Sequence, residues 1–197
     1  MKDLPIDTVA LARFLIGKML VHDLRGERTS GRIVETEAYP VGDPAGHAFR
    51  GKTSRNAPLY LARGHAYVYF VYGMYYCLNV SSERLGIGAG VLVRALEPVE
   101  GIDIMKERRG SSSLRDLARG PGRLTVAMAI DLRYNGVNLC TGPSLWLGVS
   151  EPKYHGAVSA TTRIGLSREQ SRPWRFYVRG SPFVSRPPER ATRSNRA

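Results

Sequence analysis

Apolar and polar positions change their period along the chain, and the period predicts the elements. After Asp7 or Thr8, either of which can cap a helix, Leu11, Phe14 and Leu15 recur at the three- and four-residue spacing of one helical face. Strand-like apolar and alternating segments, bounded by turn residues, dominate the rest of the chain. The predicted strands are 19–23, 31–39, 67–71, 76–80, 91–96, 145–148, 161–164 and 176–178.

Turn residues predict how these elements connect. A polar turn at 25–30 joins the first two strands into a hairpin, and 72–75 is a turn candidate between the next pair. Prolines can open helices, which we predict at 98 to about 109 and at 121 to about 130. Residues 40–56 form a long loop, and long loops in compact domains tend to be functional. Mainly antiparallel strands with a few helices predict one α+β domain.

The charge of the chain favours a polyanionic partner. Lys and Arg number 29 against 17 Asp and Glu, for a net charge of +12. An excess of this size suits nucleic acid or an acidic membrane surface. Residues 186–197 are rich in basic residues without an apolar pattern, so we expect a domain over 1–185 followed by a basic, disordered tail.

The cysteine, histidine and hydropathy patterns argue against several classes of protein. Cys77 and Cys140 form no C-x-x-C motif and predict buried free thiols. The four histidines are scattered without the spacing of metal ligands, so no metal site is expected. No apolar run approaches the roughly 18 residues of a membrane span, and residues 1–8 do not resemble a signal peptide. We therefore expect an intracellular protein.

Two acids on one predicted strand are candidates for chemistry. Because side chains alternate in a strand, Glu35, Glu37 and Tyr39 share a face with Ile33. On an exposed face the acids would be solvated charges. In a pocket, one carboxylate could act as a general base on water. The residues alone do not choose between Glu35 and Glu37.

Several arginines could meet phosphates. Arg94 lies on the apolar strand 91–96, where a guanidinium needs an acceptor such as a phosphate, or an acid such as Glu97. Arg123 follows a Gly-Pro-Gly sequence at the start of a predicted helix, whose amides could hold an anion. Arg55 belongs to the basic part of the long loop.

Aromatic residues are concentrated in one hairpin. Five tyrosines fall within ten residues, at Tyr67, Tyr69, Tyr72, Tyr75 and Tyr76. Aromatic side chains favour strands and pack there. On a basic protein they could also stack on a nucleobase or wedge between base pairs.

Taken in order, these segments resemble the alkyladenine DNA glycosylase family, also called 3-methyladenine or methylpurine DNA glycosylases. The matching segments are RIVETEAY at 32–39 with the downstream His47, YVYFVYGMYYCLN at 67–79, VLVRALEP at 91–98, GPGRL at 120–124, RFYVR at 175–179 and VSR at 184–186. The resemblance as a whole spans roughly residues 11–186, and the shared order of the segments makes it specific.

The resemblance implies a monofunctional enzyme of base excision repair. Such an enzyme flips an alkylated or deaminated purine, of the 3-methyladenine, hypoxanthine or ethenoadenine class, out of duplex DNA. It hydrolyses the N-glycosidic bond without metal, cofactor or lyase step and leaves an abasic site. The implied fold is one compact α+β domain with a curved, mainly antiparallel sheet, flanking helices and a protruding β-hairpin. The implied partner is damaged double-stranded DNA, bound by a monomer.

The resemblance also implies roles residue by residue. Glu37 matches the base that activates water. Tyr39, His47 and Tyr69 match the residues that sandwich the flipped base, and Asn79 matches a pocket position that can reject guanine.

Outside the pocket, Tyr72 matches the residue that fills the gap left by the flipped nucleotide. Arg94 matches an arginine near the phosphate of that nucleotide, and Arg55 and Arg123 are further candidates for DNA phosphates. Gly122 stands where a hydroxyl residue also occurs in the family, so one DNA hydrogen bond is expected to be absent.

Two other functions remain open. The chain could be a non-catalytic module that stacks single-stranded nucleic acid on its tyrosines, although acids on a binding face repel phosphate. It could also be a metal-dependent nuclease or hydrolase with Glu35 and Glu37 as ligands.

Overall fold

The computed structural model describes residues 4–149 and 156–185 of the chain. The strands are β1 Met19–Leu24, β2 Glu27–Tyr39, β3 Ala66–Val71, β4 Tyr75–Ser81, β5 Gly90–Glu100, β6 Leu145–Gly148, β7 Val158–Thr161 and β8 Arg175–Val178. The α-helices are α1 Thr8–Leu15, α2 Ile102–Arg109 and α3 Pro121–Ala127. Three single turns of 3₁₀ helix complete the described part: η1 Ala57–Tyr60, η2 Leu114–Asp116 and η3 Leu132–Tyr134.

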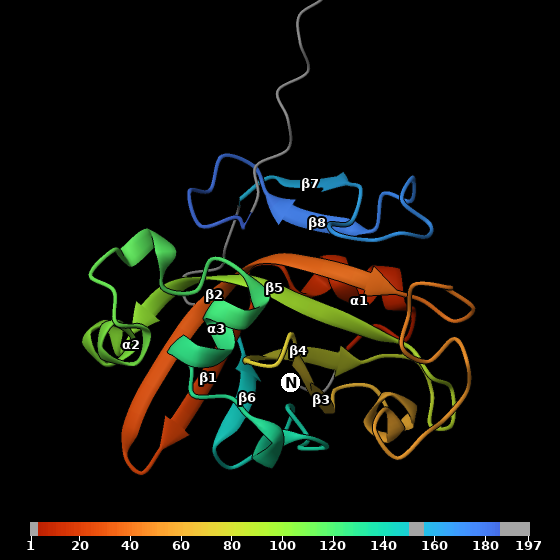
Figure 1. Cartoon of the computed structure of the whole chain (residues 1–197), viewed down its shortest axis with the longest axis horizontal. Coiled ribbons are helices and arrows are strands. Elements are labelled where there is room, and N and C mark those ends of the chain that lie inside the picture. Colours follow the sequence, from red (N-terminus) through yellow and green to blue (C-terminus); the bar gives the residue numbers. More distant parts are fainter. Residues whose placement is uncertain (1–3, 150–155, 186–197) are drawn as a thin grey trace, which may run out of the picture.

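The strands form one curved antiparallel sheet. Their order is β3-β4-β5-β2-β1-β6, and β8 joins β2 and carries β7 on its other side (Figure 1). This arrangement confirms the predicted α+β fold with a curved, mainly antiparallel sheet.

Strand β2 is the centre of the sheet and pairs with three other strands. Its first half pairs with β1, and its second half pairs with β8 at Glu35–Glu37. The other edge pairs with β5, with irregular register around Val34. Val34, Thr36 and Ala38 are fully buried, and Thr36 donates its hydroxyl hydrogen to the Ala12 carbonyl. Both faces of the second half of β2 therefore face protein.

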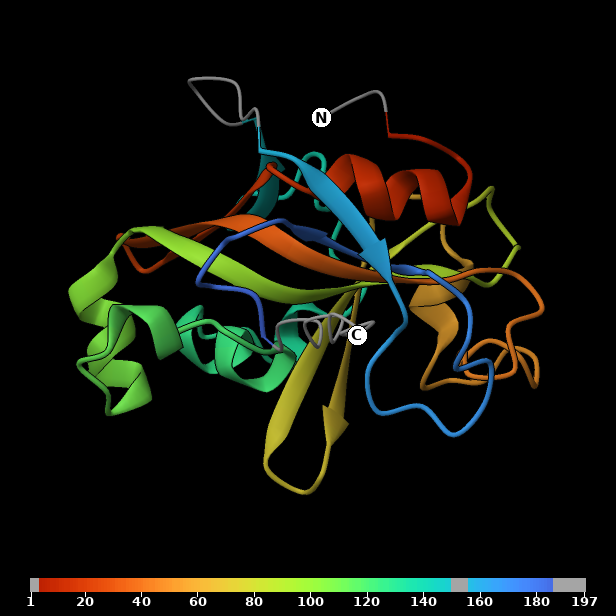
Figure 2. The ribbon, with the colours of Figure 1, turned by 90° about the horizontal axis from the view of Figure 1, so that it is seen from above.

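Helices cover both faces of the central strands. Helix α1 is capped by Asp7, whose side chain accepts a hydrogen bond of 2.7 Å from the Ala10 amide, and it buries Leu11 and Leu15. It lies on one side of β2 and β5, whereas α2 and α3 lie on the other (Figure 2). The described helices include none long and apolar enough to cross a membrane.

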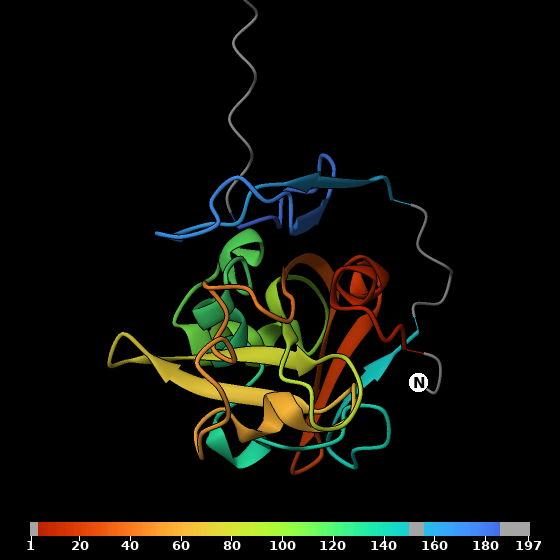
Figure 3. The same cartoon turned by 90° about the vertical axis from the view of Figure 1, so that its right-hand side faces the viewer.

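The β3–β4 hairpin protrudes from this body, as predicted (Figures 2 and 3). Strand β3 is one of the edge strands of the sheet. Near its base the edge is covered by Asn135, whose side-chain oxygen accepts the Val68 amide at 2.9 Å. The base of the hairpin is therefore anchored, and its turn extends outward.

Four predicted boundaries are wrong. The predicted turn at 25–30 is shorter because β2 begins at Glu27, and the helix predicted from 121 to about 130 ends at Ala127. The other two fail for reasons of tertiary structure. Pro98 does not open a helix: it lies inside β5 opposite Gly31, next to a register shift in the pairing with β2, and such irregularities are where strands tolerate proline. The helix begins at Ile102, after Gly101 adopts the left-handed conformation with φ of 70°. The strand predicted at 161–164 ends instead at Thr161, because the next residues turn toward β2.

Neither cysteine forms a disulfide within the described residues; Cys77 is buried as predicted, whereas Cys140 is half-buried. The tail predicted at 186–197 lies outside the described residues.

Candidate active site

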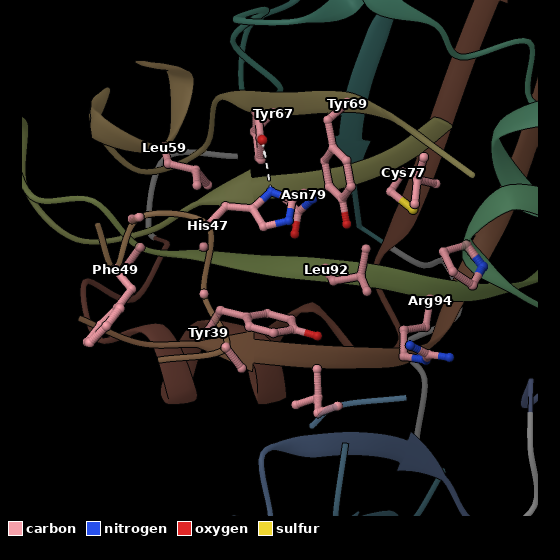
Figure 4. A pocket seen from close by; sticks show the side chains of 18 of the residues that line it. Tyr39, His47, Phe49, Leu59, Tyr67, Tyr69, Cys77, Asn79, Leu92 and Arg94 are labelled. Atoms are coloured by element: carbon pink, nitrogen blue, oxygen red, sulfur yellow. Dashed lines mark hydrogen bonds between the residues drawn. The ribbon is translucent and has the colours of Figure 1, made fainter. Parts of the chain in front are cut away.

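A cavity of about 240 Å³ opens between the β3–β4 hairpin and the end of β2 (Figure 4). Its walls come from segments far apart in the sequence: the loop after β2, the inner faces of β3, β4 and β5, and residues 164–166. Six of its residues were candidates on sequence grounds: Tyr39, His47, Tyr69, Tyr72, Asn79 and Arg94. The fold thus brings these six together around one space.

Glu37 lies directly behind the cavity wall. Its Oε2 accepts a hydrogen bond of 2.9 Å from the Tyr39 hydroxyl and pairs with Arg94 Nη1 at 3.1 Å. Its Oε1 accepts the Ile164 amide at 2.8 Å. All three partners line the cavity. Glu37 itself is fully buried, so the alternative of a solvated charge is wrong.

Glu35 is equally buried but faces a different set of partners. Its oxygens accept hydrogen bonds from Arg175 Nε at 2.6 Å, Arg94 Nε at 3.2 Å, and both the amide and hydroxyl of Ser185 at 2.6 and 2.9 Å. Of these residues only Arg94 lines the cavity. The structure therefore distinguishes the surroundings of Glu35 and Glu37, which the sequence alone could not do.

Arg94 joins the two acids. Its acceptors are Glu35 and Glu37, not Glu97, which pairs with Arg32. Burial acts to lower the pKa of Arg94, but the two carboxylates prevail and raise it, so the guanidinium stays charged. Two buried acids and two buried arginines, counting Arg175, balance in charge, which is what burial of such groups requires.

Aromatic rings form the opposite walls of the cavity. Tyr39 lies across it from Tyr67 and Tyr69 (Figure 4). The His47 ring meets Tyr69 edge-on, with centroids 4.5 Å apart, and its Nδ1 lies 2.9 Å from the Tyr67 hydroxyl. Burial, assisted by Arg55, lowers the pKa of His47, so the imidazole is held neutral near pH 7. The cavity is thus shaped for a flat, ring-shaped ligand.

Asn79 contributes an unused donor to this space. It is 7% exposed, and its Nδ2 is a buried polar atom without a hydrogen-bond partner. Its strand neighbours are Tyr67 and Leu92, which also line the cavity. A buried donor left without an acceptor costs free energy, and a ligand acceptor in the cavity would recover it.

Tyr72 occupies the tip of the hairpin. Its side chain is 88% exposed, and its backbone is left-handed with φ of 54°. Met74, at the same tip, is also exposed. An aromatic ring this exposed buries little apolar surface, so it contributes little to the stability of the fold.

The three candidate phosphate contacts differ in setting. Arg94 is buried at the cavity wall, as described above. Arg55 is exposed, donates to the Phe70 carbonyl at 3.1 Å and lies over the Tyr69 ring at 5.8 Å. Arg123, in the first turn of α3, is partly exposed and pairs with Asp116 at 3.0 Å. All three stay candidates for contacts with DNA phosphates.

Sequence reasoning missed several residues of the site. Tyr67 was assigned to strand packing, but its hydroxyl contacts His47. Strand β2 is also hydrogen-bonded by residues more than 100 positions distant in the sequence, namely Arg163, Ile164 and Ser185. No local pattern in the sequence marks them. Within 4–149 and 156–185, no group of three or more His, Cys, Asp or Glu could hold a metal ion.

Comparison with known proteins agrees with these features. The family model of methylpurine-DNA glycosylase matches residues 2–182. A protein of Mesorhizobium japonicum, provisionally named 3-methyladenine DNA glycosylase, is 59% identical over 94% of this chain and 88% of its own length. Proteins with the same provisional name are 56% identical in Paraburkholderia phytofirmans, over 94% of this chain and 86% of theirs, and 47% identical in Carboxydothermus hydrogenoformans, over 91% and 94%.

Proposed function

Since this chain belongs to the methylpurine-DNA glycosylase family, and is thus a DNA glycosylase that hydrolyses N-glycosyl bonds of alkylated bases, we propose that it flips a damaged purine into the cavity and releases it with a water activated by Glu37. The observation that carries this proposal is the environment of Glu37, whose three partners all line the cavity.

The hydrogen bonds of Glu37 leave a place for water. A carboxylate oxygen can accept about two hydrogen bonds. Oε2 already accepts hydrogen bonds from the Tyr39 hydroxyl and the Arg94 guanidinium. Among the described residues, Oε1 accepts only the Ile164 amide. We place the attacking water at Oε1. There the carboxylate can take a proton from the water and stabilise the positive charge that develops on the sugar as the base leaves.

The cavity walls support a damaged purine as the ligand. Tyr39 on one side, with His47 and Tyr69 on the other, can hold a flat base between them. Aromatic faces also attract the positive charge of some alkylated purines. The unpaired Asn79 amide can donate to an adenine-type base and clash with the exocyclic amino group of guanine. The proposed lesions are 3-methyladenine, hypoxanthine and ethenoadenine.

The protruding hairpin supports base flipping. Tyr72 at its tip can enter the minor groove and occupy the gap left by the flipped nucleotide. Arg94 would lie near the phosphate of that nucleotide, and Arg55 and Arg123 near flanking phosphates. Because the substrate is DNA, we also propose that the protein works inside the cell, as a monomer on damaged duplex.

The test is Glu37→Gln, which keeps the shape of the side chain and removes the base. General-base catalysis contributes about 10²–10⁴-fold, so abasic-site formation should fall by at least that much while affinity for lesion duplex is retained. Glu97→Gln is the matched control, since Glu97 pairs with Arg32 outside the cavity. Undiminished release of base by the Glu37 variant would refute the mechanism.

The substrate is identified with a set of duplexes that each carry one modified purine. Assays run in excess chelator separate the proposal from a metal-dependent nuclease. Binding of matched single strands, compared with lesion duplex, separates it from a single-strand binding module.

A further inference from the structure

Arg163 lies behind the cavity without lining it. The residue is 5% exposed, and its guanidinium binds both carboxylate oxygens of Asp43, which is 3% exposed. The two residues are 120 positions apart in the sequence. Neither is used by the chemistry proposed above, although both are fully buried charges.

On one side the Arg163–Asp43 pair contacts the end of β2 that carries the proposed base. Arg163 Nη1 donates to the Ala38 carbonyl at 2.9 Å, and the guanidinium carbon lies 4.6 Å from the centre of the Tyr39 ring. The next residue, Ile164, donates its amide to Glu37 at 2.8 Å. Two consecutive residues therefore hold three consecutive residues of β2, and these include the proposed base and one wall of the cavity.

On the other side the pair holds the loop that carries His47. The Asp43 carbonyl accepts the Gly46 amide at 2.9 Å, and its Oδ1 accepts the Ala45 amide at 3.0 Å. Ala45, Gly46 and His47 all line the cavity. Asp43 thus fixes the turn that presents this wall, and Arg163 ties the turn to β2.

Stability alone is a weak reason for such a pair. Burying two charges carries a desolvation cost that well-packed apolar residues avoid. Arg163 Nε is, in addition, buried without a hydrogen-bond partner. What the bidentate geometry supplies is a fixed direction and distance between two chain segments.

We propose that the Arg163–Asp43 pair is a positioning device for base excision, which holds the Glu37 carboxylate in register with the loop that binds the damaged base. This role rests on the proposed function of Glu37. Misplacement of a reacting group by about 1 Å can cost about 10²-fold in rate, so a small relaxation of this contact is enough to be measured.

The test uses Arg163→Lys, which keeps the charge but loses the planar fork, and Asp43→Asn, which keeps the shape but loses the charge. Both should lower the single-turnover rate of base release per active site by about 10–100-fold. Affinity for a duplex with a stable abasic analogue, which leaves the cavity empty, should stay within about twofold. Arg172→Lys is the matched control. The guanidinium carbons of Arg163 and Arg172 lie 5.0 and 5.4 Å from the centre of the Trp174 ring, but Arg172 is exposed and pairs with Glu169.

A merely structural pair would behave differently. It would lower Tm and the fraction of active enzyme, yet leave the rate per active site at the wild-type value, and that result would overturn the positioning role. Failure of both variants to fold would overturn it equally. Glu37→Gln distinguishes failure of the positioning role from failure of the proposed Glu37 mechanism. If Glu37→Gln is inactive while Arg163→Lys and Asp43→Asn retain the wild-type rate, only the positioning role is wrong.

Discussion

The Tyr39 hydroxyl donates a hydrogen bond of 2.9 Å to Oε2 of Glu37, two residues earlier on β2. The pleat of the strand puts both side chains on one face. Burial and the nearby Glu37 carboxylate raise the pKa of Tyr39, so the hydroxyl keeps its proton and remains a donor. One residue thus lines the cavity with its ring and orients the proposed base with its hydroxyl.

Tyr39→Phe separates these two contributions. The ring remains, while Glu37 loses one of its donors. A hydrogen bond to a charged group is worth about 1.5–3 kcal/mol, so we expect base release to fall about 10–100-fold in single-turnover assays. Affinity for lesion duplex should change little. Tyr134→Phe, which loses a hydroxyl bonded to His22 away from the cavity, is the control. An unchanged rate for Tyr39→Phe would mean that the hydroxyl does not orient Glu37.

Tyr72→Ala tests the hairpin tip. Because the side chain is 88% exposed, its removal should leave Tm unchanged. Aromatic stacking on bases is worth about 1–3 kcal/mol, so affinity for lesion duplex should fall about 5–100-fold, with Tyr72→Phe close to wild type. Val149→Ala, at an exposed position just after the far edge strand β6, should have no effect. Normal flipping of a fluorescent base analogue by Tyr72→Ala would count against the wedge.

Much of the fold could be predicted from local pattern. The strand predicted at 145–148 has the observed bounds of β6. Asp7, one of the two caps predicted for α1, is the residue that caps it, because a cap acts within one helical turn. The errors arose where tertiary contacts override propensity. Pro98 stays in a strand because its partner Gly31 sits at a register shift, and residues 162–164 leave the strand because Arg163 and Ile164 bind β2.

The site was less accessible to sequence reasoning. The alternation of side chains along a strand predicts that Glu35 and Glu37 share one face, but this pattern does not indicate which of them could act as the base. The distinction comes from partners distant in sequence, such as Ser185 for Glu35 and Ile164 for Glu37. Contacts over 120 residues or more depend on the packing of the whole chain, which a single sequence does not display. The choice of Glu37 as the candidate base came from family resemblance and not from the local pattern.

Asn79→Ser tests discrimination in the cavity. The shorter side chain removes the buried amide and makes room for the exocyclic amino group of guanine. We expect release of guanine-type lesions to rise relative to adenine-type lesions by about tenfold, since a single contact of this kind is worth about 1–3 kcal/mol. Paired kcat/KM values for two duplexes that differ only in the modified base check this. Asn138→Ser, outside the cavity, is the control, and an unchanged ratio would remove Asn79 from specificity.

His22 makes the stability of the fold sensitive to acid. The ring is fully buried, with Nδ1 against the Met128 carbonyl and Nε2 2.6 Å from the Tyr134 hydroxyl. Both contacts suit a neutral imidazole in which Nδ1 donates and Nε2 accepts. Burial lowers the pKa of His22, helped by Arg108 and Arg133 and opposed by the Met128 carbonyl and Asp131.

The sign of the effect follows from proton linkage. The unfolded chain takes up a proton as pH falls through about 6.5, whereas folded His22 stays neutral to lower pH. Stability is therefore present above pH 6.5 and lost below it, by up to about 1.4 kcal/mol per pH unit. Urea unfolding of wild type and His22→Gln at pH 7.5 and 5.5 should show a smaller loss in the variant, because His47 and the carboxylates contribute equally to both proteins. Equal losses would mean that His22 takes up its proton without cost in the folded protein.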